Sequence, residues 1–207
     1  MAQAMLHFPN CIQLKITHVK CSFKTGKKQS LQDLFYRLVC KNSVVAKHSN
    51  FITIRDTFTY CIFASGHINI TGIPDKLLTG YAVRKCERLL DLKHRKRKVK
   101  IDNITATARF IHRVDIRRLA VSQRPGFRFS LNLEIFPGLY AKHTDATVLV
   151  FATGKLVVIG AKDYNRILCV LKELWIHILE TNLFQLQKQQ EQQEQQGSQA
   201  CADMPIV

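Results

Sequence analysis

The sequence predicts an α+β fold built from two similar halves, because two of its segments each occur twice. FASGHINITG at residues 63–72 is repeated as FATGKLVVIG at residues 151–160, 88 positions later. Each copy predicts a β-hairpin, since a strand ending in Phe leads through a Ser/Thr-Gly turn into a second alternating strand. KITHVKCSF at residues 15–23 is likewise matched by KIDNITATARF at residues 100–110, with an offset of 85. Similar offsets at both ends of the unit indicate an internal duplication.

The first repeat, residues 11–92, follows a flexible lead over residues 1–10. Alternation over residues 11–23 predicts a half-buried strand, with Ile12, Leu14 and Ile16 on one face and Cys21 and Phe23 as further candidates for that face. Ser30 is placed to cap a short helix over residues 31–38. Strands are predicted near residues 44–49, 51–55, 58–63 and 67–71. Pro74 and Asp75 then open a helix to about residue 92, with Leu78, Ala82, Cys86, Leu89 and Leu90 toward the core.

A basic linker, residues 93–99, separates the repeats, and the run KHRKRKVK holds six Lys or Arg in eight residues. A solvated linker, a nuclear-import signal and a phosphate contact are all compatible with this run. The second repeat, residues 100–184, predicts a strand over 100–110, a helix over 115–121, strands near 127–134, 138–143, 146–151 and 155–159, and a long helix from about residue 163. That helix should bury Ile167, Leu168, Leu171, Leu174, Trp175 and Ile178. The Gln-rich residues 185–207 predict a disordered tail.

Composition narrows the class of partner. The 207 residues are 46% hydrophobic, which is enough for a sizeable core, and the formal net charge of +16 predicts an anionic partner. Nucleic acid and an acidic membrane surface both qualify. No apolar run reaches the roughly 20 residues that span a bilayer, and the first ten residues lack the features of a signal peptide, so we expect a soluble intracellular protein. Seven cysteines without a CxxC pair favour a reduced compartment over disulfides or a zinc site.

The predicted order in each half is strand, helix, four strands, long helix. Hairpin-connected strands with helices on one side leave the opposite face of the sheet open. Alternation places Cys61, Phe63, His67, Asn69 and Thr71 on one face of the first half and Leu149, Phe151, Lys155, Val157 and Ile159 on the same face of the second. Two further phenylalanines, Phe51 and Phe136, lie 85 residues apart just before the hairpins. The four rings therefore predict two paired apolar wedges.

Several segments resemble the TATA-binding protein family. They are EIFPGLY at residues 134–140, LVFATGKLVVIGAK at 149–162, CIFASG at 61–66 and KIDNI at 100–104, in the family's order. The resemblance covers about residues 11–180 and identifies the chain as similar to a divergent TATA-binding-protein-like paralogue. It implies a saddle in which a curved ten-stranded antiparallel sheet lays its concave side in the DNA minor groove and carries four helices on its convex side. This family is itself the standard example of minor-groove binding with apolar wedges.

The resemblance also implies roles for particular residues. The wedge pairs would be Phe51 with Phe63 and Phe136 with Phe151; Asn103 would donate to base acceptors, with Thr71 as a hydroxyl partner, and Lys142 and Lys155 would contact the DNA backbone. The implied DNA-binding set is Phe51, Phe63, Phe136, Phe151, Asn103, His18, Thr71, Thr105, Leu149, Val157, Lys142 and Lys155. Glu134 and Ile135 match positions that meet TFIIB, and Arg84, Lys85 and Arg88 match a basic surface used by TFIIA. A solvated helix face is the alternative for those basic residues.

Four positions depart from the family pattern. His18 stands where the family has a central Asn, Lys20 and Asn69 stand where it has apolar residues, and Ile159 replaces a Thr. Readout in the minor groove depends on uncharged, close-fitting groups opposite the N3 and O2 acceptors. We therefore expect a base preference that differs from strict A·T-rich specificity.

Three classes of function follow. The leading hypothesis is a nuclear, non-enzymatic initiation factor without cofactor or metal, which bends promoter DNA and nucleates a preinitiation complex with TFIIA, TFIIB and the RNA polymerase II machinery. The alternative is an interaction protein with weakened DNA binding, which binds TFIIA or TFIIB and competes with the housekeeping factor. An enzyme is disfavoured because the sequence holds no evident carboxylate pair, Cys-His pair or metal-spaced cluster.

Overall fold

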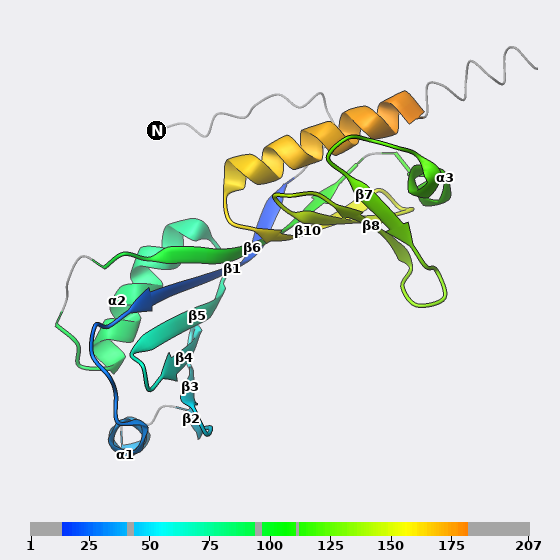
Figure 1. The fold of residues 1–207 in the computed structure, drawn as a ribbon. Helices are drawn as coiled ribbons and strands as arrows, with labels where there is room; N and C mark the ends of the chain where they lie inside the picture. Colours follow the sequence, from blue (N-terminus) through cyan, green and yellow to red (C-terminus); the bar gives the residue numbers. More distant parts are fainter. Residues whose placement is uncertain (1–13, 41–43, 94–96, 111, 182–207) are drawn as a thin grey trace, which may run out of the picture.

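The computed structural model describes residues 14–40, 44–93, 97–110 and 112–181. These residues form one ten-stranded antiparallel sheet in the order β2-β3-β4-β5-β1-β6-β10-β9-β8-β7. The first strands of the two repeats, β1 and β6, pair at its centre, and each repeat extends outward from them (Figure 1). The predicted duplicated α+β architecture is therefore confirmed. The predicted lead over residues 1–10 and the Gln-rich tail lie outside the described residues.

The first repeat follows the predicted order. Its elements are β1 (Lys15–Lys24), α1 (Leu31–Val39), β2 (Val44–Lys47), β3 (Phe51–Arg55), β4 (Thr59–Phe63), β5 (His67–Ile73), the 3-10 helix η1 (Lys76–Leu78) and α2 (Thr79–Leu89). Ser30 caps α1 as predicted, because its hydroxyl accepts a hydrogen bond from the Asp33 N–H at 3.4 Å. The prediction that Leu78 faces the core is wrong, since Leu78 is 39% exposed. It ends the tighter 3-10 turn, which places its side chain off the buried stripe of α2.

The second repeat also keeps the predicted order. Its elements are β6 (Lys100–Arg109), α3 (Ile116–Val121), β7 (Arg128–Leu131), β8 (Gly138–Lys142), β9 (Thr147–Phe151), β10 (Lys155–Ala161) and a C-terminal helix over residues 164–181. Strand β7 is shorter than expected because the backbone turns after it, with the N–H groups of Ile135 and Phe136 donating to the Asn132 carbonyl at 3.3 and 3.0 Å. Phe136 therefore lies in a loop just before β8.

Strand β1 departs from simple alternation. Its pairing with β6 shifts between Ile16 and His18 and again between Lys20 and Cys21. Regular alternation would put Ile16 and Cys21 on opposite faces, because they are five positions apart. The shifts instead let both Ile16 and Cys21 pack on the helix side, where Val19 and Phe23 are buried as well. His18 and Lys20 are consequently left to the other face.

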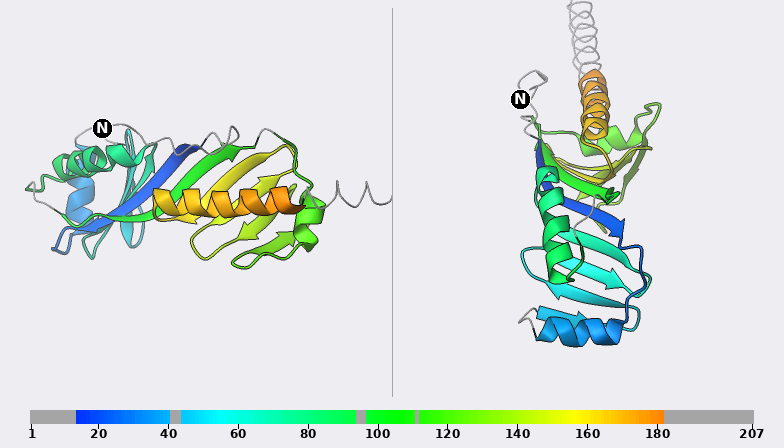
Figure 2. Two further views of the ribbon diagram at one scale, coloured as in Figure 1. Left: turned by 90° about the horizontal axis from the view of Figure 1, so that it is seen from above. Right: turned by 90° about the vertical axis from the view of Figure 1, so that its left-hand side faces the viewer.

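The helices lie on one side of the sheet (Figure 2). Under them are two apolar clusters, one in each repeat, and Ile16 and Ile101 pack against both. Trp175 of the C-terminal helix packs on Phe110 with 4.5 Å between ring centroids. Five of the six residues predicted to be buried in this helix are so, while Leu168 is only half-buried. None of the helices in the described ranges is long and apolar enough to cross a membrane.

Candidate nucleic-acid interface

The side of the sheet opposite the helices carries the residues singled out from the sequence. Directly opposed residues of an antiparallel pair project to the same face. In the first half Phe51 opposes Phe63, and Thr59 opposes Thr71. In the second half Val157 opposes both Leu149 and Thr107. These residues are half-buried, whereas their strand neighbours on the helix side are fully buried. In the described part of the chain, no helix covers this concave face (Figure 2).

The predicted wedges are two pairs of neighbouring rings at separate places on the concave face. The Phe51 and Phe63 centroids are 5.4 Å apart with an interplanar angle of 37°, and those of Phe136 and Phe151 are 5.6 Å apart at 62°. All four rings are half-buried. Gly138 allows the second pair to approach, since a Cβ there would lie 2.7 Å from Phe136 Cε1 and 3.2 Å from Phe151 Cε1. Each pair thus keeps exposed aromatic surface outside the core.

Other rings extend these pairs, and sequence reasoning missed two of them. The His48 ring stacks on Phe51 with 4.3 Å between centroids and an angle of 21°, and its Nε2 lies 3.2 Å from Thr53 Oγ1. His67 lies 6.1 Å from Phe63, and Tyr140 lies 5.1 Å from Phe136. Tyr140 could have been found from its alternation with Gly138. His48 precedes β3 in a loop, where no periodicity locates a side chain.

The centre of the concave face is occupied by polar groups from β1 and β6. The Gly160 N–H donates to Asn103 Oδ1 at 2.8 Å, and Asn103 Nδ2 donates to Thr105 Oγ1 at 3.2 Å. With its oxygen accepting from the backbone, the amide retains a second N–H as a donor. Lys20 opposes Asn103 and His18 opposes Thr105 in the β1–β6 pairing. Hydrogen-bond donors and a cation therefore meet at the middle of the sheet.

Cations also line the face toward its ends. Lys155 opposes Arg109, and Lys142 opposes Arg128, in the second half. All four are exposed. In the first half Lys24 opposes His67. Such a distribution attracts a polyanion and contributes affinity that does not depend on base sequence.

The predicted partner residues lie away from the concave floor. Ile135, next to Glu134 in the turn before β8, is 83% exposed, and Glu134 is exposed as well. Arg84 and Arg88 are exposed on α2. Lys85 differs, because its ammonium lies 2.7 Å from the Asp56 carboxylate and donates to Thr57 Oγ1 at 2.6 Å. The hydrogen bond from Lys85 lowers the pKa of Asp56, and the pair holds α2 against the β3–β4 turn.

The basic linker is only partly solvated. Arg97 Nε lies 2.5 Å from a carboxylate oxygen of the buried Glu87, and Arg97 Nη1 donates to the Thr25 carbonyl at 3.4 Å. Its guanidinium carbon also lies 5.6 Å from the Phe23 ring centroid. Lys93 and Lys98 are exposed, and residues 94–96 lie outside the described part. Among the described residues, no group of three or more His, Cys, Asp or Glu side chains is placed to hold a metal ion.

An open antiparallel saddle built from two repeats, with four ring residues and a cationic surface on its uncovered face, defines a class of domain suited to an elongated anionic partner. A solved structure of this class, Methanococcus jannaschii TBP, superposes with a TM-score of 0.70 and 25% identity, over 81% of this chain and 99% of that one. Residues 98–179 match the family described as "Transcription factor TFIID (or TATA-binding protein, TBP)".

Relatives of known name agree with that match. The chain is 35% identical to a TATA-box-binding protein of Aeropyrum pernix over 81 residues, 38% of each chain. It is 33% identical to mouse TATA box-binding protein-like 2 over 53% of this chain and 32% of the relative. It is also 33% identical to TATA-box-binding protein 1 of Triticum aestivum over 59% of this chain and 54% of the relative. The chain thus spans about a third to a half of the length of these relatives.

The fold, the family match over residues 98–179 and these relatives together support a protein of the TATA-binding protein family. The family is one of transcription factors and not of enzymes. The expectation of a family member with the saddle architecture is confirmed.

Proposed function

We propose that the protein is a nuclear DNA-binding transcription factor whose concave face lies in the minor groove of duplex DNA and bends it. The observation that carries this proposal is the presence of two pairs of apposed, half-buried phenylalanines on one uncovered face of the sheet. A flat ring can enter a base step and replace part of the stacking lost there. Each opened step costs a few kcal/mol, which contacts between the bent DNA and the concave face offset.

The part of the concave face between the two wedges, called the floor here, supports minor-groove binding in the second half. Leu149 and Val157 are half-buried, uncharged and opposed across β9 and β10, so they can lie close to base edges. Asn103 is held with an amide donor available at the centre, where the minor groove presents N3 and O2 acceptors. Lys142 and Lys155 supply charge for the phosphates. Thr71, Thr105 and His18 complete the proposed DNA-facing set.

Partner binding follows from what remains exposed when the concave face is occupied. We assign the turn that carries Glu134 and Ile135 to a TFIIB-like factor, because an 83% exposed isoleucine beside an acid is a ready contact. Arg84 and Arg88 on α2 are assigned to a TFIIA-like factor. Lys85 contributes less, because its ammonium is already paired with Asp56. In this proposal the DNA-bound protein nucleates an initiation complex for RNA polymerase II.

A second candidate function has an observation of its own. The first-half floor places Lys20 opposite Asn103 and Asn69 opposite Cys61, so its residues are more polar than those of the second half. Burying a lysine against a groove floor costs desolvation unless it finds an acceptor. The competing possibility is an interaction protein that binds TFIIA or TFIIB, has weak affinity for DNA and competes with the housekeeping factor.

Fluorescence transfer between the ends of a labelled TATA duplex tests both functions. We expect the wild type to bend the duplex, and the double variant F136A/F151A to lose the kink at the second wedge while its thermal unfolding stays cooperative. Tyr36→Ala is the matched control, because it removes a ring that is 60% exposed on α1, outside the concave face. Normal bending by F136A/F151A would exclude the wedge mechanism. Absence of bending by the wild type, with retained binding of TFIIA, would favour the competitor.

A further inference from the structure

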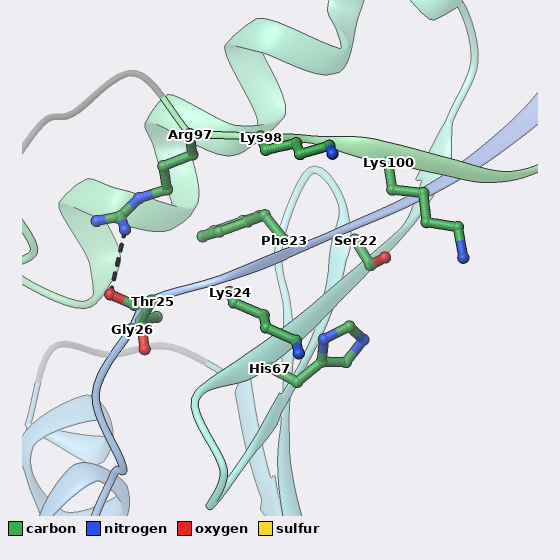
Figure 3. Close-up of a pocket in the computed structure, with 9 residues that line it drawn as sticks. All are labelled: Ser22, Phe23, Lys24, Thr25, Gly26, His67, Arg97, Lys98 and Lys100. Atoms are coloured by element: carbon green, nitrogen blue, oxygen red, sulfur yellow. Dashed lines mark hydrogen bonds between the residues drawn. The ribbon is translucent and has the colours of Figure 1, made fainter.

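A cavity of about 480 Å³ opens between the end of β1, the start of β5 and the linker before β6 (Figure 3). Its wall includes Ser22, Lys24, His67, Arg97, Lys98 and Lys100. All of the described residues that line it are cationic, polar or apolar, and none is acidic. The cavity is open to solvent, so its cations are accessible to a dissolved anion.

Strand pairing places this cavity at the edge of the concave face. Ser22 opposes Lys100, and Lys24 opposes His67, so these side chains project to the same side of the sheet as the wedges. Figure 3 shows the Lys24 ammonium beside the His67 ring. The His67 ring is in turn 6.1 Å from that of Phe63. The cavity is therefore a direct neighbour of the first wedge.

Arg97 holds the linker against the cavity and is not itself the main source of its charge. Its Nε is paired with Glu87 at 2.5 Å, and its Nη1 donates to the Thr25 carbonyl. Lys98 follows directly and is exposed. Lys100 is 70% exposed, and its ammonium is 3.7 Å from the Asp102 carboxylate, a pairing that solvent weakens. The three lysines thus provide the positive charge that faces the cavity, and Arg97 acts as a positioning residue.

We propose that this cavity is a phosphate-binding site that takes a backbone phosphate of the DNA strand next to the first wedge. The inference rests on the function proposed above. Three ammonium groups, an imidazole and a hydroxyl around an open cavity match the charge and hydrogen-bonding needs of a phosphate. Duplex DNA carries one negative charge per about 1.7 Å of axis, so a phosphate necessarily passes close to any ring that enters a base step.

The second half has a related group of cations at the equivalent place. By the repeat offsets, Lys24 corresponds to Arg109 and His67 to Lys155, and these two oppose each other in the sheet. By the offset of 85, Lys100 corresponds to Lys15, which is exposed and opposes Thr107 as Lys100 opposes Ser22. The position that corresponds to Lys98 is Gln13, which carries no charge.

Salt dependence of DNA binding tests the site. Each neutralised phosphate contributes about 0.9 to the slope of log K against log salt concentration. We expect K24Q/K98Q/K100Q to lower that slope by about one, because one phosphate contact is lost. The matched control K76Q/R117Q/K172Q removes the same charge from exposed positions on η1, α3 and the C-terminal helix and should change the slope much less. Equal changes in the two triple variants would overturn the proposal.

A scan with single neutral methylphosphonate linkages locates the phosphate. In the wild type, replacement at one or two adjacent positions beside the first wedge should weaken binding. The same replacements should have no further effect on K24Q/K98Q/K100Q, because the contact is already lost. If they weaken wild type and variant equally, the lysines do not contact that phosphate and the assignment is wrong.

Pyrophosphate, titrated without DNA, separates this inference from the proposed function. We expect it to shift the backbone amide signals of Ser22 and His67 in the wild type and not in K24Q/K98Q/K100Q. Saturable pyrophosphate binding by a protein that fails to bend any duplex would support a phosphate site for a free ligand and overturn the DNA function. Intact bending without pyrophosphate binding, and with an unchanged salt slope, would overturn the site alone.

Discussion

The two halves of the saddle share a backbone and differ in chemistry on the concave face. On the helix side both present aliphatic residues at equivalent positions, such as Ile68 and Ile70 in β5 and Leu156 and Val158 in β10, all fully buried. On the concave side the second half presents Val157 and Ile159, while the first presents Asn69 and Thr71 at the equivalent positions. The comparison shows that packing against the helices maintains the fold, while the open face is free to diverge in what it binds.

The largest expected effect comes from removing one wedge at a time and comparing the two double variants. F136A/F151A should abolish bending at its own end, and F51A/F63A should do the same at the other, since each pair opens one step at a cost of a few kcal/mol. We expect F136A/F151A to weaken binding more, because its half has the apolar floor that contacts bases. Fluorescence transfer with donors at either end measures each kink separately. Equal losses of affinity would indicate that the floors contribute alike.

Reciprocal substitutions at the floor should have the next largest effect. Lys20→Val restores an uncharged surface beside Asn103 and should raise the preference for an A·T-rich duplex over a G·C-substituted one by about tenfold, or about 1.4 kcal/mol. Val157→Lys places the same charge in the second half and should lower that preference. Competition binding with the two duplexes at fixed salt gives the ratio. If Lys20→Val leaves the preference unchanged, Lys20 does not contribute to base recognition at the floor.

Gly138→Ala should have a moderate effect that is confined to the second wedge. The added Cβ would meet the rings of Phe136 and Phe151 at 2.7 and 3.2 Å, so at least one ring must move, at a cost of about 1–3 kcal/mol. Bending should fall while the first wedge still functions. Gly80→Ala is the control, because its nearest contact is 3.6 Å away and alanine suits a helix. Urea unfolding and DNA bending, measured separately on each variant, distinguish a loss of stability from a loss of wedge geometry.

The smallest expected effect is a pH dependence of stability in the second half. Burial, assisted by the charge of Arg124, lowers the pKa of His177, whose Nε2 lies 2.8 Å from Ser122 Oγ. The unfolded chain then binds the proton more readily than the folded one, so stability is complete above the usual value of 6.5 and declines as the pH falls below it. His177→Gln should flatten the change in urea midpoint between about pH 7.5 and about pH 5.5. If His177→Gln leaves the pH dependence of stability unaltered, that dependence comes from other titratable groups.

Much of the fold could be predicted because alternation and duplication reinforced each other. A hairpin whose first strand ends at Phe63 is a stronger prediction because Phe151 ends a strand at the matching place in the second repeat. Both phenylalanines lie in paired strands on the same face of the sheet. The bulges in β1 could not be predicted, since Ile16 and Cys21 keep their apolar character whichever face they reach. The η1 turn that exposes Leu78 depends on backbone geometry after Asp75 and not on hydropathy.

The candidate site was predictable where it is carried by strands. Asn103 and Val157 lie on the predicted face because period-two alternation fixes it. The contact of Arg97 with Glu87 joins residues ten positions apart through a linker with no periodicity. The basic run around Arg97 suggested a solvated linker, a nuclear-import signal or a phosphate contact, and none of these predicts that ion pair. The contact of His48 with the Phe51 ring could not be predicted either, because His48 lies in a loop without periodicity. Long-range side-chain contacts from loops need coordinates, because no local pattern constrains them.

The pairing of β1 with β6 makes the sheet the joint product of both repeats. Strand β1 has β5 on one side and β6 on the other, so one of its two pairing partners lies about 85 residues away in sequence. A protease cut within the linker would therefore separate the chain into two incomplete sheets, each with a long uncovered edge. Those edges are complementary to each other, and we expect the two fragments to reassemble without a covalent link, as the subunits of a dimer would.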